Sequence, residues 1–372
     1  MSSRLRAFVV TPITMKRFRK FLSQNPLIFL LLAIPLTFAA QVLHWSSIAI
    51  FILAAIGIIP LASYIGEATE DLASYTDPRL GALLNATLGN AAELIITVTA
   101  VQAGLLELVK ASITGSIIGN LLLVLGFSIV VGGLRHGTQT FNKVNASRNA
   151  ILLVLAVVTL VIPSVFSQSI VGAAADSKVE ALSIGVAVIM IALYGLGLLD
   201  AARQKESALS HTMPKSELPD WTLAQAITIL ALSTIGVVYL SEALVRVAED
   251  VIVGLGISEF FLGIILVPLI GNVAEHLVAV QMALKNKMDL SVEIAVSSSL
   301  QIALFVAPLL VFISLMLGHP LHLIFNKFEL LALMAAVVIS ALVSSDGEST
   351  WLEGAGLLAI YIILGLAFFL LP

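Results

Sequence analysis

The stretch LGALLNATLGNAAELIITVTAVQAG, residues 80–104, places one carboxylate near the middle of an apolar run that is long enough to cross a membrane. The acid is Glu93, the last residue of the pentapeptide GNAAE that begins at Gly89. The pattern returns 182 positions later as GNVAE, from Gly271 to Glu275, inside another long apolar run. A charged side chain at the centre of a membrane helix costs roughly 2.5 to 3.5 kcal/mol. Two acids at matching buried positions therefore predict a functional site.

Each acid is accompanied by an asparagine and a glycine. Asn90 lies three residues before Glu93, and Asn272 has the same place in the second copy, a spacing that puts amide and carboxylate on one helix face. The preceding glycines, Gly89 and Gly271, allow another backbone to approach, or allow the helix to break and turn its carbonyls inward. The alternative for the acids is a structural pair, and for the asparagines it is hydrogen bonding between helices.

The composition is that of a polytopic membrane protein. Of 372 residues, 59% are hydrophobic and 11% are charged, and the mean hydropathy is +1.07, whereas a soluble domain is usually about 25% charged. The 19 basic residues form no stripe and the net charge is -4, which argues against nucleic acid as a partner and for a lipid bilayer. The chain has no cysteine, which excludes disulfides and thiolate metal sites.

Polar stretches divide the chain into eleven apolar segments. A hydrocarbon core of about 30 Å needs ~20 apolar residues per helix. The predicted transmembrane helices are 26–43, 47–66, 80–104, 111–134, 149–167, 179–199, 222–241, 257–283, 291–317, 328–344 and 352–371. We therefore expect an all-α integral membrane protein.

The basic residues predict the orientation of these helices. Six Lys or Arg precede the first helix and no small-residue cleavage site follows it, so we expect a retained helix and a cytoplasmic N-terminus. Fifteen basic residues then fall in inside segments. Four fall in outside segments, namely Lys110, Lys178, Arg246 and Lys327. This ratio follows the positive-inside rule, and the lack of an organelle signal favours a prokaryotic plasma membrane.

Helices three and eight then cross the membrane in opposite directions, so the two motif copies are antiparallel. We expect one added helix and two inverted five-helix repeats (1 + 5 + 5), a transporter design with its site between the halves. The predicted divisions are an N-terminal segment with the extra helix (1–45), a first repeat (46–200), a cytoplasmic linker (201–220) and a second repeat (221–372). The oligomeric state stays open, with a homo-oligomer as one alternative.

The repeat extends to polar residues on the neighbouring helices. Ser116 and Ser298 share the 182-residue offset, and we expect their hydroxyls near the site together with Asn120 and Gln301. His276 follows the second acid only. It either shuttles protons or packs as a neutral ring.

Other acids lie near predicted helix ends. Glu70, at the end of the second helix, is interpreted as part of a cytoplasmic access route for cations. Eight further acids are interpreted as solvated helix ends or membrane-interface residues: Glu67, Asp71, Glu107, Glu180, Glu242, Glu249, Asp250 and Glu329. An access route is the alternative for those that follow helices two and seven.

The oxygen atoms of this set indicate the chemistry. Two carboxylates, amide oxygens, hydroxyls and backbone carbonyls suit hard cations such as Ca²⁺, Mn²⁺ or Mg²⁺. Burial and a second nearby carboxylate both favour the neutral acid, so an empty site holds protons and a divalent cation expels them. Glu93 and Glu275 are the predicted metal ligands and proton carriers. We expect no cofactor, only transported Ca²⁺ and H⁺.

Six stretches of the sequence together resemble one known family. They are Leu83–Leu94 (LLNATLGNAAEL), Gly115–Gly126 (GSIIGNLLLVLG), Gly256–Glu259 (GISE), Gly271–His276 (GNVAEH), Lys287–Ser291 (KMDLS) and Ser298–Leu304 (SSLQIAL). The family that they resemble is that of the calcium/cation:proton antiporters (CAX). The likeness spans nearly the whole chain after the first helix, and the form Gly-Asn-x-x-Glu-His is fairly specific.

The resemblance implies that the motif acids exchange a cation for protons, with the motif asparagines in support. It also implies that Glu70, Ser298 and Gln301 line the pathway or support the site. Sodium/calcium exchangers, a related branch, usually have a proline before the motif acid. Ala92 and Ala274 stand there in this chain, which favours protons over Na⁺ as the counter-ion.

The sequence thus predicts an antiporter that exports cytosolic Ca²⁺ by alternating access and uses inward protons. The alternatives are an antiporter for Mn²⁺ or Na⁺ and, with less support, a passive cation channel. An enzyme is not expected, because no nucleophile and base are arranged for catalysis near the membrane midplane.

Overall fold

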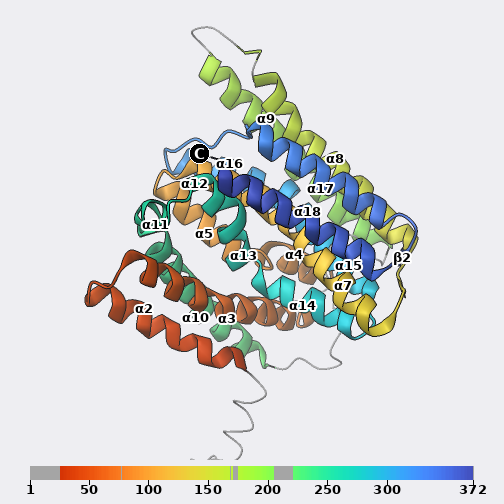
Figure 1. Ribbon diagram of the computed structural model, residues 1–372, viewed down its shortest axis with the longest axis horizontal. Helices are drawn as coiled ribbons and strands as arrows, with labels where there is room; N and C mark the ends of the chain where they lie inside the picture. Colours follow the sequence, from red (N-terminus) through yellow and green to blue (C-terminus); the bar gives the residue numbers. More distant parts are fainter. Residues whose placement is uncertain (1–25, 77, 168, 171–174, 205–220, 372) are drawn as a thin grey trace, which may run out of the picture.

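The computed structural model describes residues 26–76, 78–167, 169–170, 175–204 and 221–371. Apart from two short strands, its regular elements are helical, so the predicted all-α class is confirmed (Figure 1). In order they are η1 (Pro26–Leu32), α2 (Ala33–Val42), α3 (Ser47–Ser74), α4 (Pro78–Leu88), α5 (Ala91–Gln102), α6 (Leu106–Ile118), η2 (Gly119–Val124), α7 (Leu125–His136), β1 (Gln139–Thr140), α8 (Lys143–Ser167), α9 (Ala175–Gln204), α10 (Leu223–Arg246), α11 (Ala248–Leu255), α12 (Glu259–Phe261), η3 (Leu262–Leu266), α13 (Val267–Gly271), α14 (Val273–Leu284), α15 (Met288–Gln301), η4 (Ile302–Val306), α16 (Ala307–Met316), α17 (Lys327–Val343), β2 (Glu348–Ser349) and α18 (Trp351–Leu370).

Seven helices in the described chain are long and apolar enough to cross a membrane. An eighth span results if α11 and the α12–α13 segment are taken together, although they meet at a bend of 113°. The other apolar helices are shorter, at Leu27–Val42, Ala91–Gln102 and Val273–Leu284. The chain is therefore a multi-pass membrane protein, while the count of eleven crossings and the inverted repeat stay predictions. The predicted cytoplasmic N-terminus and most of the predicted linker (1–25 and 205–220) lie outside the described residues.

Several helices continue past their predicted ends. α3 runs to Ser74, so Glu70 lies inside this helix and not after it. α9 reaches Gln204 and α10 reaches Arg246. Hydropathy falls at these ends, but residues such as Ala, Leu and Glu have high helix propensity and extend the hydrogen-bonded backbone into the polar region.

Both motif segments break at their asparagine. Asn90 separates α4 from α5, and Asn272 separates α13 from α14. The two residues have nearly the same backbone angles, with φ −96° and ψ 18° at Asn90 and φ −104° and ψ 11° at Asn272. The breaks free backbone polar groups directly beside the motif acids.

Glycines allow segments from the two parts of the chain to cross closely. A Cβ atom on Gly115 of α6 would lie 2.1 Å from the carbonyl oxygen of Ile264 in η3. α7 and α18 meet in the same way, because a Cβ atom on Gly354 would lie 2.6 Å from the carbonyl oxygen of Gly126. Each crossing joins a helix that precedes the linker to one that follows it.

Three connections meet at one end of the molecule. Gln139 of β1 pairs with Ser349 of β2, and its side chain donates to Asn286 Oδ1, between α14 and α15, at 2.9 Å. The backbone N–H of Asn142, just before α8, donates to Asp289 in the first turn of α15. All three connections belong to segments that the positive-inside rule assigns to the inside.

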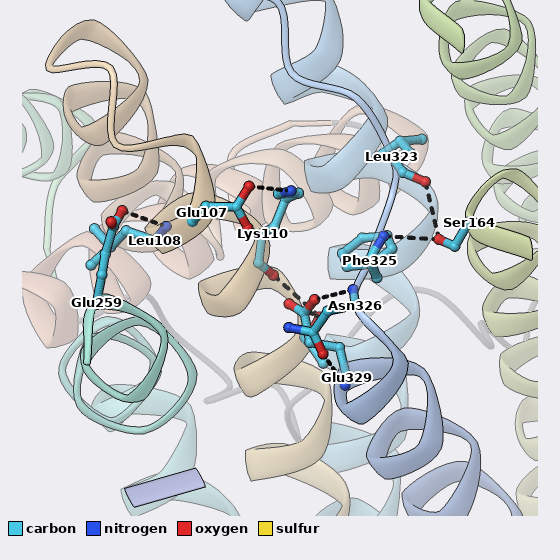
Figure 2. Close-up of polar contacts among 10 residues, drawn as sticks. Glu107, Leu108, Lys110, Ser164, Glu259, Leu323, Phe325, Asn326 and Glu329 are labelled. Carbon is cyan, nitrogen blue, oxygen red and sulfur yellow. Dashed lines mark hydrogen bonds and ion pairs between the residues drawn. The ribbon is translucent and has the colours of Figure 1, made fainter. Parts of the chain in front are cut away.

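Figure 2 shows polar contacts near the C-terminal end of α8. The backbone N–H of Phe325 donates to Ser164 Oγ at 2.9 Å, and the backbone N–H of Leu108 in α6 donates to Glu259 Oε1 in α12 at 3.1 Å. These residues lie in or next to the predicted outside segments. The contacts thus bring together segments that are predicted to lie on one side of the membrane, and which side this is stays a prediction.

Candidate functional site

Each motif glutamate is held by a serine of a neighbouring helix. Ser116 of α6 donates to Glu93 Oε1, and Ser298 of α15 donates to Glu275 Oε2 at 2.5 Å. In both pairs the serine follows the acid by 23 residues. The two copies therefore make the same contact on either side of the molecule's centre.

The motif asparagines join one copy to the other. Asn272 Nδ2 donates to Ser116 Oγ at 3.0 Å, and Asn90 Nδ2 donates to Gln301 Oε1 at 2.5 Å. Each bond links a residue that precedes the linker with one that follows it. Neither copy of the motif therefore has its full set of contacts without the other.

The two acids differ in their exposure. Glu93 is only 2% exposed, whereas Glu275 is partly exposed. Glu93 Oε2 and Asn90 Oδ1 are buried and have no hydrogen-bond partner among the described residues. Gly271 packs against Glu93, since a Cβ atom there would lie 3.5 Å from Glu93 Cα. Buried acceptor atoms are normally satisfied, so this place fits a proton or a cation.

The ligands available at this place are oxygen atoms. The described part of the chain contains no group of three or more His, Cys, Asp and Glu side chains that could hold a metal ion. A cation between Glu93 and Glu275 would therefore be held by two carboxylates together with amide, hydroxyl and backbone oxygens. Such a set fits a hard divalent cation such as Ca²⁺.

Besides Gly271, three predicted site residues lie outside this hydrogen-bonded network. Glu70 is exposed on α3, a helix that packs beside α10 and also touches α5 and α14, which carry the motif acids (Figure 1). His276 Nε2 is buried and has no hydrogen-bond partner in the described chain. Gly89 is at a tight place, because a Cβ atom there would lie 2.6 Å from the carbonyl oxygen of Asn85.

Other polar residues complete or correct the sequence interpretation. Asn120 joins the network by donating to Ser298 Oγ at 3.0 Å. Glu329, predicted at the membrane interface, is only 2% exposed, because it closes the capping box of α17 and accepts a hydrogen bond from Thr114 at 3.4 Å (Figure 2). Glu293 on α15 was not predicted as a site residue. The feature that could have revealed it is a charged residue just inside a predicted apolar helix.

The comparison with known proteins decides the family. The sequence profile of the sodium/calcium exchanger protein family matches residues 46–199 and 225–370, which contain both motifs and both site serines. The chain belongs to this family. Together the matched ranges cover most of the chain before and after the linker.

Members of the family are similar to this chain along nearly its whole length. It is 45% identical to the Ca(2+)/H(+) antiporter of Aphanothece halophytica, covering 94% of this chain and 98% of the relative. It is 46% identical to the Ca(2+)/H(+) antiporter ChaA of Bacillus subtilis, covering 93% and 100%. Among solved structures, native YfkE has a TM-score of 0.81 at 45% identity and covers 93% of this chain and 100% of its own.

Proposed function

We propose that this chain is a secondary active transporter that exchanges cytosolic Ca²⁺ for external protons at Glu93 and Glu275. The proposal rests chiefly on one observation, the network in which both acids, their serines and the motif asparagines are bonded across the two copies. The names of the relatives that are 45% and 46% identical to this chain support the choice of ions.

Protons and Ca²⁺ cannot occupy such a site at the same time. Two ionised carboxylates in a poorly hydrated place repel each other and are stable only around a cation. Without the cation they hold protons, and Ca²⁺ binding releases these protons because only the ionised oxygens are good ligands. If the site changes the side of the membrane to which it opens only while it holds protons or Ca²⁺, the protein exchanges these ions and does not let them leak.

Alternating access then carries each load across the membrane. In this structure Glu275 is the more exposed acid and Glu93 is buried, which is the asymmetry expected when the site is reached from one side only. The opposite conformation would expose the site to the other side. The breaks at Asn90 and Asn272 allow the short helices that carry the acids to move separately from α4 and α13.

The architecture proposed for this mechanism has eleven crossings, arranged as one added helix and two inverted five-helix repeats. It is supported by the meeting of predicted inside connections at one end of the molecule and of predicted outside segments at the other. The N-terminus is proposed to lie in the cytoplasm, and the membrane to be a prokaryotic plasma membrane. Whether copies of the chain associate is left to measurement.

The test is calcium-45 uptake into proteoliposomes under an imposed pH gradient. We expect uptake that depends on the gradient in the wild type and is abolished in Glu93→Gln and in Glu275→Gln, since each amide can neither release a proton nor balance the cation's charge. Glu348→Gln, an exposed acid on β2, is the control and should transport normally.

Other outcomes would replace the proposal. Uptake that ignores the pH gradient indicates a passive cation channel, and uptake driven by Na⁺ indicates a Na⁺-coupled exchanger. Stronger competition by Mn²⁺ than by unlabelled Ca²⁺ makes Mn²⁺ the substrate. Full activity in both Gln variants would reduce the two acids to structural residues.

A further inference from the structure

One carboxylate inside α15 is not used by the proposed site. Between Ser291 and Gln301 every residue of this helix is buried except Glu293, which is partly exposed. α15 is also a central helix, because two-thirds of the membrane-length window that it forms with α16 is buried inside the protein. Glu293 is therefore the accessible side chain in an otherwise buried stretch of α15.

Glu293 has no partner for its charge. In the described chain its carboxylate forms no ion pair and accepts no hydrogen bond, and the ion pairs found there, Lys110 with Glu107 and Arg246 with Glu242, are on other helices. An unpaired carboxylate within a membrane segment is stable only beside water or as the protonated acid. A carboxyl group that is in contact with water and can also be protonated is able to gain and lose protons.

The surroundings of Glu293 change steadily along α15. Asp289, one turn earlier, is exposed and accepts a hydrogen bond from the connection before α8. Glu293 is partly exposed, and Ser297, one turn later, is buried and donates to the carbonyl oxygen of Glu293 at 2.5 Å. Exposure thus decreases from the end of the molecule where three connections meet toward its centre.

The same face of α15 leads to the candidate site. Residues four apart are neighbours on a helix, so Glu293, Ser297 and Gln301 form one polar row. Gln301 accepts the hydrogen bond from Asn90, a member of the site. With a rise of 1.5 Å per residue, Glu293 lies about 12 Å along the axis from Gln301. A proton that covers this distance must pass along this row or through water beside it.

This row has no counterpart in the first copy. The positions 182 residues earlier are Ala111, Gly115 and Gly119, none of which has a polar side chain. The motif acids and their serines are duplicated, whereas the row is not. The polar row therefore lies toward only one end of the molecule.

We propose that Glu293 is a proton-transfer residue that connects the Glu93–Glu275 site with water at the end of the molecule formed by β1, β2 and the α14–α15 connection. This inference rests on the proposed Ca²⁺/H⁺ exchange. When Ca²⁺ enters, an O–H bond of a site carboxyl group breaks and its proton passes through water to a carboxylate oxygen of Glu293. Glu293 then gives a proton to bulk water beside Asp289 and returns to its starting charge.

The charged and titratable neighbours of this route lie on α15 and on the elements around it. Asp289 is on α15 itself. The helices α6, α7, α8 and α14 pack against α15, and their charged and titratable residues are Glu107, Lys110, Arg135, His136, Lys143, Arg148, Glu275 and His276. Lys285 and Lys287 lie in the connection just before α15. None of these side chains pairs with Glu293 in the described chain, so proton transfer competes with no salt bridge.

The experiment measures the rate of Ca²⁺/H⁺ exchange and the equilibrium Ca²⁺ affinity of the full chain in proteoliposomes. In Glu293→Gln we expect the maximal exchange rate to fall about tenfold, a modest value for a lost proton-transfer group. Equilibrium Ca²⁺ affinity should not change, because Glu293 does not touch the ion. Imidazole, a small diffusible proton carrier, should restore the rate as its concentration rises, and Glu293→Asp should keep most of the activity.

Glu348→Gln is the matched control, because it removes an exposed acid at the same end of the molecule. An unchanged exchange rate in Glu293→Gln, with wild-type exchange intact, would overturn this inference alone. A lower rate that imidazole does not restore would also overturn it, since that result indicates a packing role. A wild type that moves Ca²⁺ without protons would overturn the proposed function, and this inference with it.

Discussion

Ser116 makes two hydrogen bonds at the centre of the site, one to Glu93 and one from Asn272. A hydroxyl is needed for both, because it must donate to one partner and accept from the other. Gly115 and Gly119 on the same helix have no side chain that could replace it. The serine therefore connects the acid of one copy with the amide of the other.

Ser116→Ala should weaken Ca²⁺ binding by up to about 30-fold, since the loss of two hydrogen bonds worth about 1 kcal/mol each leaves the site less ordered. The matched control is Ser112→Ala, one turn earlier on α6, because Ser112 is fully buried and its Oγ has no hydrogen-bond partner in the described chain. Calcium titration of both variants in detergent checks this. Equal losses would indicate a general effect of shortening a buried serine.

Two protons on two acids set the pH dependence of the site. Because Ca²⁺ binding to the wild type displaces both, its apparent affinity should fall by up to ~100-fold for each unit of pH below neutrality. Glu275→Gln leaves one displaceable proton, so any residual binding should change by only ~10-fold per unit. Binding isotherms at several pH values measure these slopes. A slope that is identical in both proteins would mean that Glu275 carries no proton.

At the scale of the element, the crossing of α6 and η3 depends on Gly115. A Cβ atom there would lie 2.1 Å from the carbonyl oxygen of Ile264, so the helices must separate. Ser116 and Asn272 are placed by these segments and would separate with them. A change of packing far smaller than a helix displacement is enough to lengthen their hydrogen bond.

Gly115→Ala should therefore lower the melting temperature by several degrees and reduce transport. Gly119→Ala is the control, four residues later, where a Cβ atom would meet nothing within 4 Å. That change should be neutral or slightly stabilising, because alanine has the higher helix propensity. The melting temperatures of the variants are compared by heating each protein and measuring the folded fraction by size-exclusion chromatography. Equal melting temperatures would show that the crossing tolerates a methyl group.

The elements show what a sequence pattern can and cannot predict. Apolar length predicted the helical class, and the motif glycines left two alternatives open, a helix break or a close backbone approach, because these features follow from local chemistry. The predicted ends of α3 and α9 were wrong, because hydropathy contains no information on helix propensity outside the membrane. The bond between Asn90 and Gln301 joins residues 211 positions apart, and no local rule specifies such a partner. Glu293 was missed because it lies near a predicted boundary.

At the scale of the whole molecule, the proposed orientation can be tested directly. The chain has no cysteine, so single introduced thiols are the only ones available for labelling. Lys327→Cys should react with a membrane-impermeant maleimide in intact cells, because it is exposed in a predicted outside segment. Glu348→Cys, exposed at the opposite end, should react only after the membrane is opened. The reverse pattern would place the N-terminus outside.

The small sheet has a consequence for how the protein is made. Ser349 on β2 lies 210 residues after Gln139, with which it pairs, so this contact forms only after both strands and the chain between them have left the ribosome. α18 follows β2 and covers Gly126 and Gly133 of α7. During synthesis this face of α7 is in the membrane without its partner helix. Insertion of α18 thus completes the packing of α7, and a chain that stops before Trp351 should be recognised as unfinished and degraded.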